Sequence, residues 1–373
     1  MAHTSQMTAR ERVRETLAHR PPCRVPFSWQ FCATEEMQRT LERELAGRGI
    51  SWPTLRIATE DICTLSPKEP WTTCGAGRVR DIWGIIWADV AYGGGQYREV
   101  AQSPFGGEAN MAELGAYPWP DPDTVDYVTL QQQAEQTPSD RATKLACGNP
   151  FETLCWMTGL EETLCRCLTE PEWIVAALGR ITQYYSARLR QSLEALDAAP
   201  DILFFCDDLG SQQGPLMSPA MYRELLQPFH ARLFAEARTM APEARIMMHS
   251  DGAVMPLLDD LLDAGLEVLE AVQTDCVCME PEVLKERFGA RLAFHGGISV
   301  QQVLPHADAA TVEAECARLV RVFGAGGGYV AAPSHAIQPG TPVVNVLAML
   351  RGILGPEAYD EALFCARLDA AVP

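Results

Sequence analysis

The sequence predicts an α/β fold, a (β/α)8 TIM-type barrel with a small β-hairpin insertion. From residue 140 onward, short apolar runs alternate with helical patterns at βα spacing, and two earlier apolar runs raise the expected strands to eight. The 373 residues, 47% of them hydrophobic, suffice for one such barrel or for two ordinary domains. We expect a single domain over residues 1–373. No G-x-G-x-x-G motif follows the first expected strand, which disfavours the alternative of a doubly wound open sheet.

The N-terminal part predicts two helices and two strands. Helical periodicity covers residues 8–18 and 34–47, and Pro21 and Pro22 cannot continue the first helix. The strands are expected at residues 24–30 and near 57–63.

Residues 75–103 have a different pattern from the rest of the chain. Aromatic and β-branched residues alternate around a glycine triplet at 93–95, which is typical of a β-hairpin rather than a βα unit. We interpret residues 75–103 as an insertion within the barrel.

Strands and helices are then expected to alternate up to residue 333. The six further strands are expected at 144–149, 202–208, 245–250, 267–273, 291–297 and 328–333. The helical patterns cover 161–196 in two pieces, 219–240, 254–264, 280–288 and 309–323. Because the carboxyl ends of barrel strands face the active site, polar residues at those ends are the functional candidates.

The composition argues against several classes of partner. Lys and Arg total 30 against 49 acidic residues, a formal charge of -19, so neither nucleic acid nor an anionic membrane surface is expected as a partner. The start of the chain lacks the apolar core of a signal peptide, and no stretch of about 18 apolar residues follows. We therefore expect a cytoplasmic protein whose 13 scattered cysteines are mostly reduced.

Polar residues gather where the strands are expected to end. Three of the seven histidines are among them, whereas His3, His19, His230 and His306 are expected at the surface. This concentration predicts a polar site at the barrel mouth. Its members are Gln30, Asn149, Asp207, Asp208, His249, Asp251, Gln273, His295, Ser334 and His335.

The clearest candidate for metal binding is the segment R-I-M-M-H-S-D-G, residues 245–252. An apolar strand ends there on His249 and Asp251, whose spacing of two lets both side chains point the same way. They can hold a divalent cation or share a proton, and the alternative is a packed histidine beside a helix-capping aspartate. With His335 as third ligand the set would leave one position open, as catalytic zinc does; alternatively, His335 is a loop histidine.

The catalytic candidates are Asp207, Asp208 and His295. The two aspartates can be a general acid/base pair, a secondary metal site or part of a helix N-cap. His295 can lie near the reacting group, bind an anion beside two glycines, or be a packed histidine. We assign Gln30, Asn149 and Gln273 to substrate binding.

Five segments together resemble the uroporphyrinogen decarboxylase superfamily, which includes the cobalamin-dependent methyltransferases. The resemblance covers nearly the whole chain and implies the barrel independently of the strand count. The segments are R-E-R-V-R-E-T-L-A-H-R-P-P-C-R-V-P at 10–26, D-D-L-G-S-Q-Q-G-P-L-M-S-P at 207–219, H-S-D-G at 249–252 with the P-L-L-D-D-L-L-D-A-G that follows, and residues 281–298 and 332–342.

The decarboxylases of that superfamily have an arginine-bearing R-Q-A-G-R-Y stretch after the first strand, which binds the carboxylates of the substrate. Here the corresponding residues 27–33 read F-S-W-Q-F-C-A and contain no arginine. A net charge of -19 does not help recruit a polyanion either. Decarboxylation of a porphyrinogen or another acid is therefore the alternative function.

The methyltransferase branch binds zinc through an H-x-C motif and a later cysteine. By this resemblance, the matching residues in this chain are His249, Asp251 and His335. The resemblance implies Zn²⁺, or another divalent metal, with both sulfur ligands replaced. A site without thiolates is a better Lewis acid, which favours O-demethylation of a methoxylated aromatic over activation of a thiol. Asp207 or Asp208 would orient this substrate or move a proton.

A corrinoid is the expected carrier of the methyl group. The chain has no D-x-H-x-x-G corrinoid-binding motif, so the corrinoid is expected on a separate partner protein. The other expected partner is a small-molecule methyl donor or acceptor. A further alternative is a non-catalytic barrel that binds a small ligand, and the oligomeric state stays open.

Overall fold

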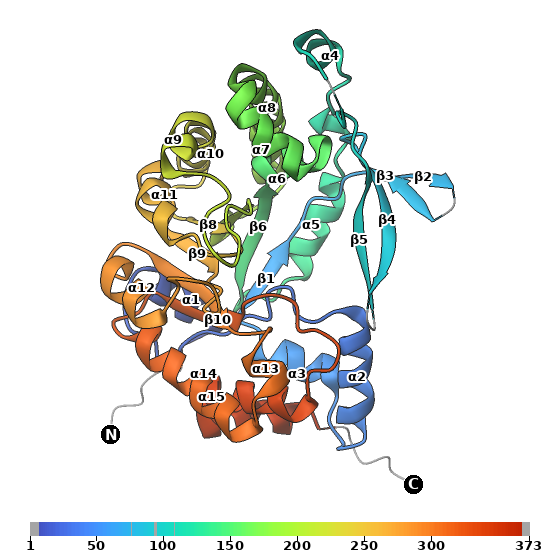
Figure 1. Cartoon of the computed structure of the whole chain (residues 1–373). Helices are drawn as coiled ribbons and strands as arrows, with labels where there is room; N and C mark the ends of the chain where they lie inside the picture. The colour runs from blue at the N-terminus through green and yellow to red at the C-terminus, as the bar shows by residue number, and fades with distance from the viewer. Residues whose placement is uncertain (1–6, 76, 93–94, 108, 368–373) are drawn as a thin grey trace. The chain divides into compact units, whose positions relative to one another are not determined.

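The computed structural model describes residues 7–75, 77–92, 95–107 and 109–367 (Figure 1). Contacts divide the described chain into two compact units. Unit 1 holds the described residues up to Cys63, Ser139–Ala142, and those from Val268 onward; unit 2 holds Thr64–Pro138 and Thr143–Glu267. A single domain over residues 1–373 stays a prediction.

Three parallel strands form the centre of unit 2. β6 (Ala142–Gly148), β7 (Ile202–Cys206) and β8 (Arg245–His249) pair in this order, with Cys206 opposite His249. The first four residues of β7, Ile-Leu-Phe-Phe, are all buried, as expected for a strand covered on both faces. The predicted strands in these three regions are confirmed.

Several helices of unit 2 begin with a proline as their first residue. α6 (Pro150–Thr158), α8 (Pro171–Glu194) and α9 (Pro219–Leu225) each start with a proline, whose missing N–H would have no partner in a first helical turn. The others are α4 (Met111–Ala116), η1 (Pro122–Thr124), α5 (Tyr127–Gln136), α7 (Leu160–Thr169), α10 (Gln227–Met240), η2 (Met255–Leu257) and α11 (Leu258–Ala264).

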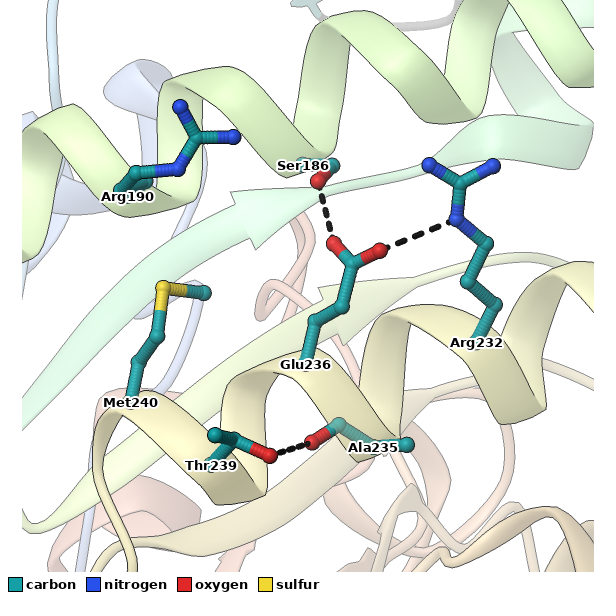
Figure 2. Close-up of a pocket in the computed structure, with 7 residues that line it drawn as sticks. All are labelled: Ser186, Arg190, Arg232, Ala235, Glu236, Thr239 and Met240. Atoms are coloured by element: carbon teal, nitrogen blue, oxygen red, sulfur yellow. Dashed lines mark hydrogen bonds and ion pairs between the residues drawn. The ribbon is translucent and has the colours of Figure 1, made fainter.

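A cavity of about 410 Å³ lies between α8 and α10. In Figure 2 the carboxylate of Glu236, on α10, lies between the Ser186 hydroxyl and the Arg232 guanidinium and accepts a hydrogen bond from each. Arg190 and Met240 line the same cavity. This cavity is therefore built on helix faces, away from the carboxyl ends of the strands.

A separate antiparallel sheet belongs to unit 2. It has the order β2 (Thr72–Gly75), β3 (Arg78–Arg80), β4 (Ile86–Tyr92), β5 (Gly95–Gln102). β4 and β5 form a hairpin inside the range predicted for the insertion, residues 75–103. β2 and β3 were not expected, because four and three residues give too little alternation for a pattern.

Unit 1 also has three parallel strands, β9 (Val268–Ala271), β10 (Ala293–Ile298) and β11 (Tyr329–Pro333), paired in this order. All three lie within predicted ranges except for the last residue of β10. β1 (Ile62–Leu65) begins in unit 1. The helices are α1 (Ala9–Leu17), α2 (Glu35–Ala46), α3 (Trp52–Thr59), α12 (Pro281–Phe288), α13 (Val303–His306), α14 (Ala309–Gly324) and α15 (Val343–Cys365).

Two early strand predictions differ from the structure. Residues 24–30 make only one β-bridge, Phe27 to Ala331, with hydrogen bonds from Ser28 N and to the Pro26 carbonyl. Pro26 cannot donate, and the chain turns at Gln30, whose φ is +55°. The second expected strand, 57–63, is helical up to Thr59 and becomes β1 only at Ile62.

Among the described residues, no helix combines the length and the apolar character needed to cross a bilayer. The alternation of parallel strands and helices confirms the α/β class.

Candidate metal centre

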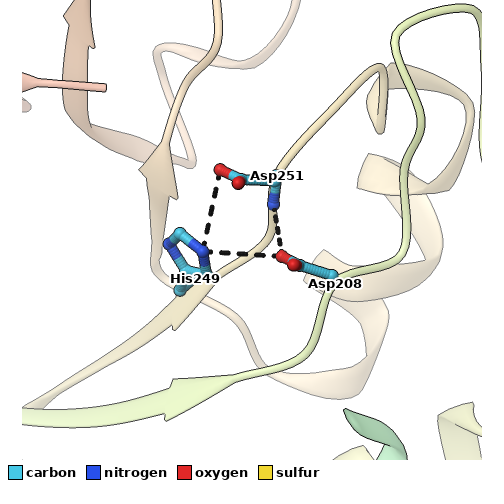
Figure 3. Close-up of side chains that lie close together, drawn as sticks. All are labelled: Asp208, His249 and Asp251. Atoms are coloured by element: carbon cyan, nitrogen blue, oxygen red, sulfur yellow. Dashed lines mark hydrogen bonds and ion pairs between the residues drawn. The ribbon is translucent and has the colours of Figure 1, made fainter. Parts of the chain in front are cut away.

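Asp208, His249 and Asp251 form a cluster at the carboxyl ends of β7 and β8 (Figure 3). Each offers one ligand atom, and these atoms all lie within 4.8 Å of one another. The His249 Nε2 atom is 3.5 Å from Asp208 Oδ1 and 3.7 Å from Asp251 Oδ1. Parallel neighbours end at the same edge of a sheet, so residues distant in sequence meet there.

The two loops that carry the cluster are joined by hydrogen bonds. Asp207 N donates to the His249 carbonyl at 3.0 Å, Leu209 N to the Ser250 hydroxyl at 2.9 Å, and Asp251 N to Asp208 Oδ1 at 2.8 Å. The last bond orients the Asp208 carboxylate. The ligand atoms are therefore positioned by the backbone.

Two glycines allow these loops to approach each other. Gly252 has a φ of +88°, and a β-carbon built there would lie 2.4 Å from the carbonyl carbon of Gly210. Both the left-handed conformation and the close contact exclude a side chain.

Replacing Gly252 by alanine is expected to weaken metal binding at least tenfold, because the loop must move away from Gly210 and take Asp251 with it. Titration of purified protein with Zn²⁺ measures this change. The matched control is Gly340→Ala, since Gly340 has a φ of +90° but open space around its β position. Equal Zn²⁺ affinity in the two variants would show that the close approach does not matter.

Glu152, near the start of α6, is a second acidic group at this site that the sequence analysis missed. Its side chain accepts a hydrogen bond from Asn149 Nδ2 at 3.3 Å. Burial, followed by the charges of Asp208 and Asp207, raises the pKa of Glu152 to about 8. Glu152 therefore keeps its proton at neutral pH. Only its position three residues after a strand end pointed to it in the sequence.

Asp207 does not point to solvent but into a buried network. Its Oδ2 atom lies 2.7 Å from His230 Nε2, and its Oδ1 atom accepts from Glu152 N at 2.8 Å. The Tyr222 hydroxyl lies 2.9 Å from the other ring nitrogen of His230. Burial raises the pKa of Asp207, and the hydrogen bond with His230 opposes that shift.

The prediction of His230 as a surface residue is wrong, since His230 is only 2% exposed. It lies on the inner face of α10 with Leu233, Phe234 and Ala237. This spacing of i, i+3, i+4 and i+7 is the signal of a buried helical face and could have identified it. The contact between Asp207 and His230 holds the segment that leads into Asp208 in place.

The three predicted substrate-binding residues lie in different places. Asn149 Oδ1 accepts from the Tyr185 hydroxyl at 2.9 Å, so Asn149 links Glu152 to α8. Gln30 and Gln273 belong to unit 1, where Gln273 is buried and its Oε1 atom accepts from the Cys276 thiol at 3.4 Å. Binding of substrate by these three residues stays a prediction.

His295 and His335 also belong to unit 1. His295 is fully buried, with Nδ1 3.8 Å from Oε1 of the fully buried Glu270. The His335 ring lies 5.1 Å from that of Phe31. The catalytic role of His295 and the ligand role of His335 stay predictions. The cluster in unit 2 instead adds Asp208 to the predicted ligands His249 and Asp251.

The donor set suits a divalent cation. One imidazole and two carboxylates are ligands for Zn²⁺ and for harder ions such as Mn²⁺, and the cluster contains no sulfur donor. Its two acids need a compensating positive charge when both are ionised.

Comparison with known structures and sequences shows the fold and the family of this chain. A methyltransferase from Methanosarcina mazei has a similar structure, with a TM-score of 0.63 and 18% sequence identity; the match covers 95% of this chain and 99% of that chain. This likeness concerns the fold alone, and it confirms the predicted class of α/β TIM-type barrel.

The model of the family described as uroporphyrinogen decarboxylase (URO-D) matches residues 90–353. The chain belongs to this family. The uroporphyrinogen decarboxylases of Coxiella burnetii strains Dugway 5J108-111 and RSA 331 / Henzerling II are each 22% identical to it over 218 residues. Those residues are 55% of this chain and 55% of each relative, so the chain spans about half the length of the relatives it matches.

Proposed function

We propose that this protein is a metal-dependent methyltransferase that moves a methyl group between a small substrate and a corrinoid on a separate protein. The observation that carries the proposal is the cluster of Asp208, His249 and Asp251, whose ligand atoms lie within 4.8 Å of one another. The likeness of the fold to a methyltransferase supports it.

In this proposal Asp208, His249 and Asp251 would hold the metal. A divalent metal bound there would supply Lewis acidity to an oxygen or sulfur atom of the substrate. Because the three residues offer only imidazole and carboxylate donors, an ether oxygen, as in a methoxylated aromatic, is the preferred reacting group.

The other residues of the site bind and orient. Asp207 is held by His230 and by Glu152 N and so fixes the backbone that carries Asp208. Glu152, which keeps its proton at neutral pH in the metal-free protein, would donate that proton to the leaving oxygen or keep a hydrogen bond to the substrate. Asn149 orients that carboxyl group.

Metal content tests the ligand assignment. Purified wild-type protein is expected to contain about one divalent ion per chain, and His249→Ala is expected to lose it, because the imidazole is the central donor of the cluster. Elemental analysis after dialysis measures both. His306→Ala, which removes an exposed histidine, is the matched control and should keep the metal. Wild-type protein that stays metal-free after Zn²⁺ is offered would contradict the assignment.

Decarboxylation of a porphyrinogen or another acid is the second candidate, favoured by the activity for which the C. burnetii relatives are named. The two candidates differ in product. Methylation of a corrinoid protein by a methoxylated aromatic, detected as a change in the absorption spectrum of the corrinoid, would support the methyltransferase function. Formation of coproporphyrinogen from uroporphyrinogen would establish the second, and binding without turnover of either substrate would favour a non-catalytic barrel.

A further inference from the structure

Unit 1 has a cavity of about 780 Å³ that the proposed function does not use. Three arginines line it: Arg12 from α1, Arg24 from the following loop, and Arg141, which precedes β6. Their side chains are 8%, 22% and 20% exposed, so Arg12 is buried and Arg24 and Arg141 are partly buried. Such burial of cations is costly unless anions compensate it.

One buried carboxylate faces these arginines. Asp61, with a fully buried side chain, accepts from Arg12 Nη2 at 2.6 Å, from Arg24 Nη1 at 3.0 Å and Nη2 at 3.2 Å, and from Phe27 N at 2.9 Å. These bonds use the acceptor positions of the carboxylate. Three guanidinium groups therefore surround a single fully buried carboxylate, and the other acids near them, Asp140, Glu357 and Glu361, are exposed to solvent.

Arg141 has the greatest capacity to bind a ligand. Within the described residues its guanidinium makes no hydrogen bond, and its ion pairs with Asp61 and Asp140 are both 3.9 Å long. A guanidinium group has five N–H donors in a planar fork that matches an oxyanion. Arg141 is thus not needed to neutralise Asp61.

The second half of α15 also lines the cavity. Ala358 and Ala362, four residues apart after the break in the helix at Gly355, give a short apolar stripe of small side chains, and Leu354 lines the cavity from before that break. Glu357 and Glu361 also line the cavity, but they are exposed, so water and salt screen their charges. The cavity therefore has a cationic wall and an apolar wall, and its volume suits a small organic molecule.

We propose that this cavity binds a small organic oxyanion with two negative charges, of the phosphate monoester class. The charged group contacts Arg24 and Arg141, and the organic part lies along Ala358 and Ala362. The residues named here belong to unit 1 and the metal cluster belongs to unit 2, so the two sites share no residue.

Calorimetric titration of the full chain with inorganic phosphate and with phenyl phosphate tests the proposal. We expect saturable binding of both ligands, tighter for phenyl phosphate because its ring covers the apolar stripe. Arg141→Gln should weaken both at least tenfold, since a charged hydrogen-bond donor is lost while Arg12 and Arg24 still hold Asp61. Arg48→Gln, an exposed arginine of the same unit outside the cavity, is the matched control and should bind like wild type.

Two further variants make the test decisive. Ala358→Glu adds a negative charge to the cavity wall without touching the Asp61 cluster, and it should also weaken phosphate binding. His249→Ala should leave phosphate affinity unchanged, which separates this cavity from the proposed metal centre. The absence of saturable phosphate binding in wild type, or equal affinity in wild type, Arg141→Gln and Ala358→Glu, would overturn the proposal.

Discussion

Replacing His230 by leucine is expected to lower the free energy of unfolding by about 3–5 kcal/mol, the range for leaving a buried carboxylate without its partner. His230 Nε2 lies 2.7 Å from Asp207 Oδ2, and the two side chains are 3% and 1% exposed. Leucine fills the volume but leaves the carboxyl group of Asp207 and the hydroxyl of Tyr222 without this partner. Chemical denaturation at neutral pH measures the loss.

The matched control is His306→Leu, which removes an exposed histidine and should change stability by less than about 0.5 kcal/mol. In the double variant with Asp207→Asn, the cost of His230→Leu should shrink, because the buried carboxylate is then absent. Equal costs in both backgrounds would show that His230 acts through packing against Phe234 rather than through Asp207.

Replacing Glu152 by glutamine is expected to stabilise the metal-free protein by about 2–4 kcal/mol at pH 8.5 and by little at pH 4. The folded-state pKa of about 8 lies above the ordinary value of 4.5. Between these pH values the folded protein holds a proton that the unfolded chain has lost, so wild-type stability falls as pH rises from about 4.5 to about 8. Full burial would give about 5 kcal/mol, and the partial exposure of Glu152 reduces this figure.

Denaturation of both proteins in a chelating buffer at several pH values measures this difference. Glu161→Gln is the matched control, because Glu161 is an exposed glutamate in the first turn of the next helix, α7, away from the buried acidic groups. The explanation fails when the stability of wild type and of Glu152→Gln changes in parallel across this pH range.

The substitutions of His230 and Glu152 both affect the same cluster of acidic side chains. Asp207, Asp208, Asp251 and Glu152 come from three different elements, and each is compensated in a different way. Asp207 is paired with His230, Glu152 keeps a proton, and Asp208 and Asp251 face His249. The two carboxylates beside His249 are thus the ones left for a metal.

Much of the fold could be predicted because it depends on local patterns. The buried strands β7 and β8 contain the apolar runs Ile-Leu-Phe-Phe and Ile-Met-Met, and α8 and α14 have helical periodicity over many residues. The prediction at 24–30 was wrong for a local reason as well: Pro26 and the left-handed Gln30 leave room for only one bridge.

The α/β class and the proximity of His249 and Asp251 could be inferred from the sequence alone, because the geometry of a strand end places residues two apart on the same side of the chain. Three further facts required the folded structure: Asp208 lies beside His249 and Asp251, Glu152 keeps its proton, and His230 is buried against Asp207. These three facts depend on contacts between β7, β8, α6 and α10. The burial and the charge environment of a side chain at such a contact depend on which elements pack together in the fold. The sequence pattern of one segment does not show which other segment will pack against it.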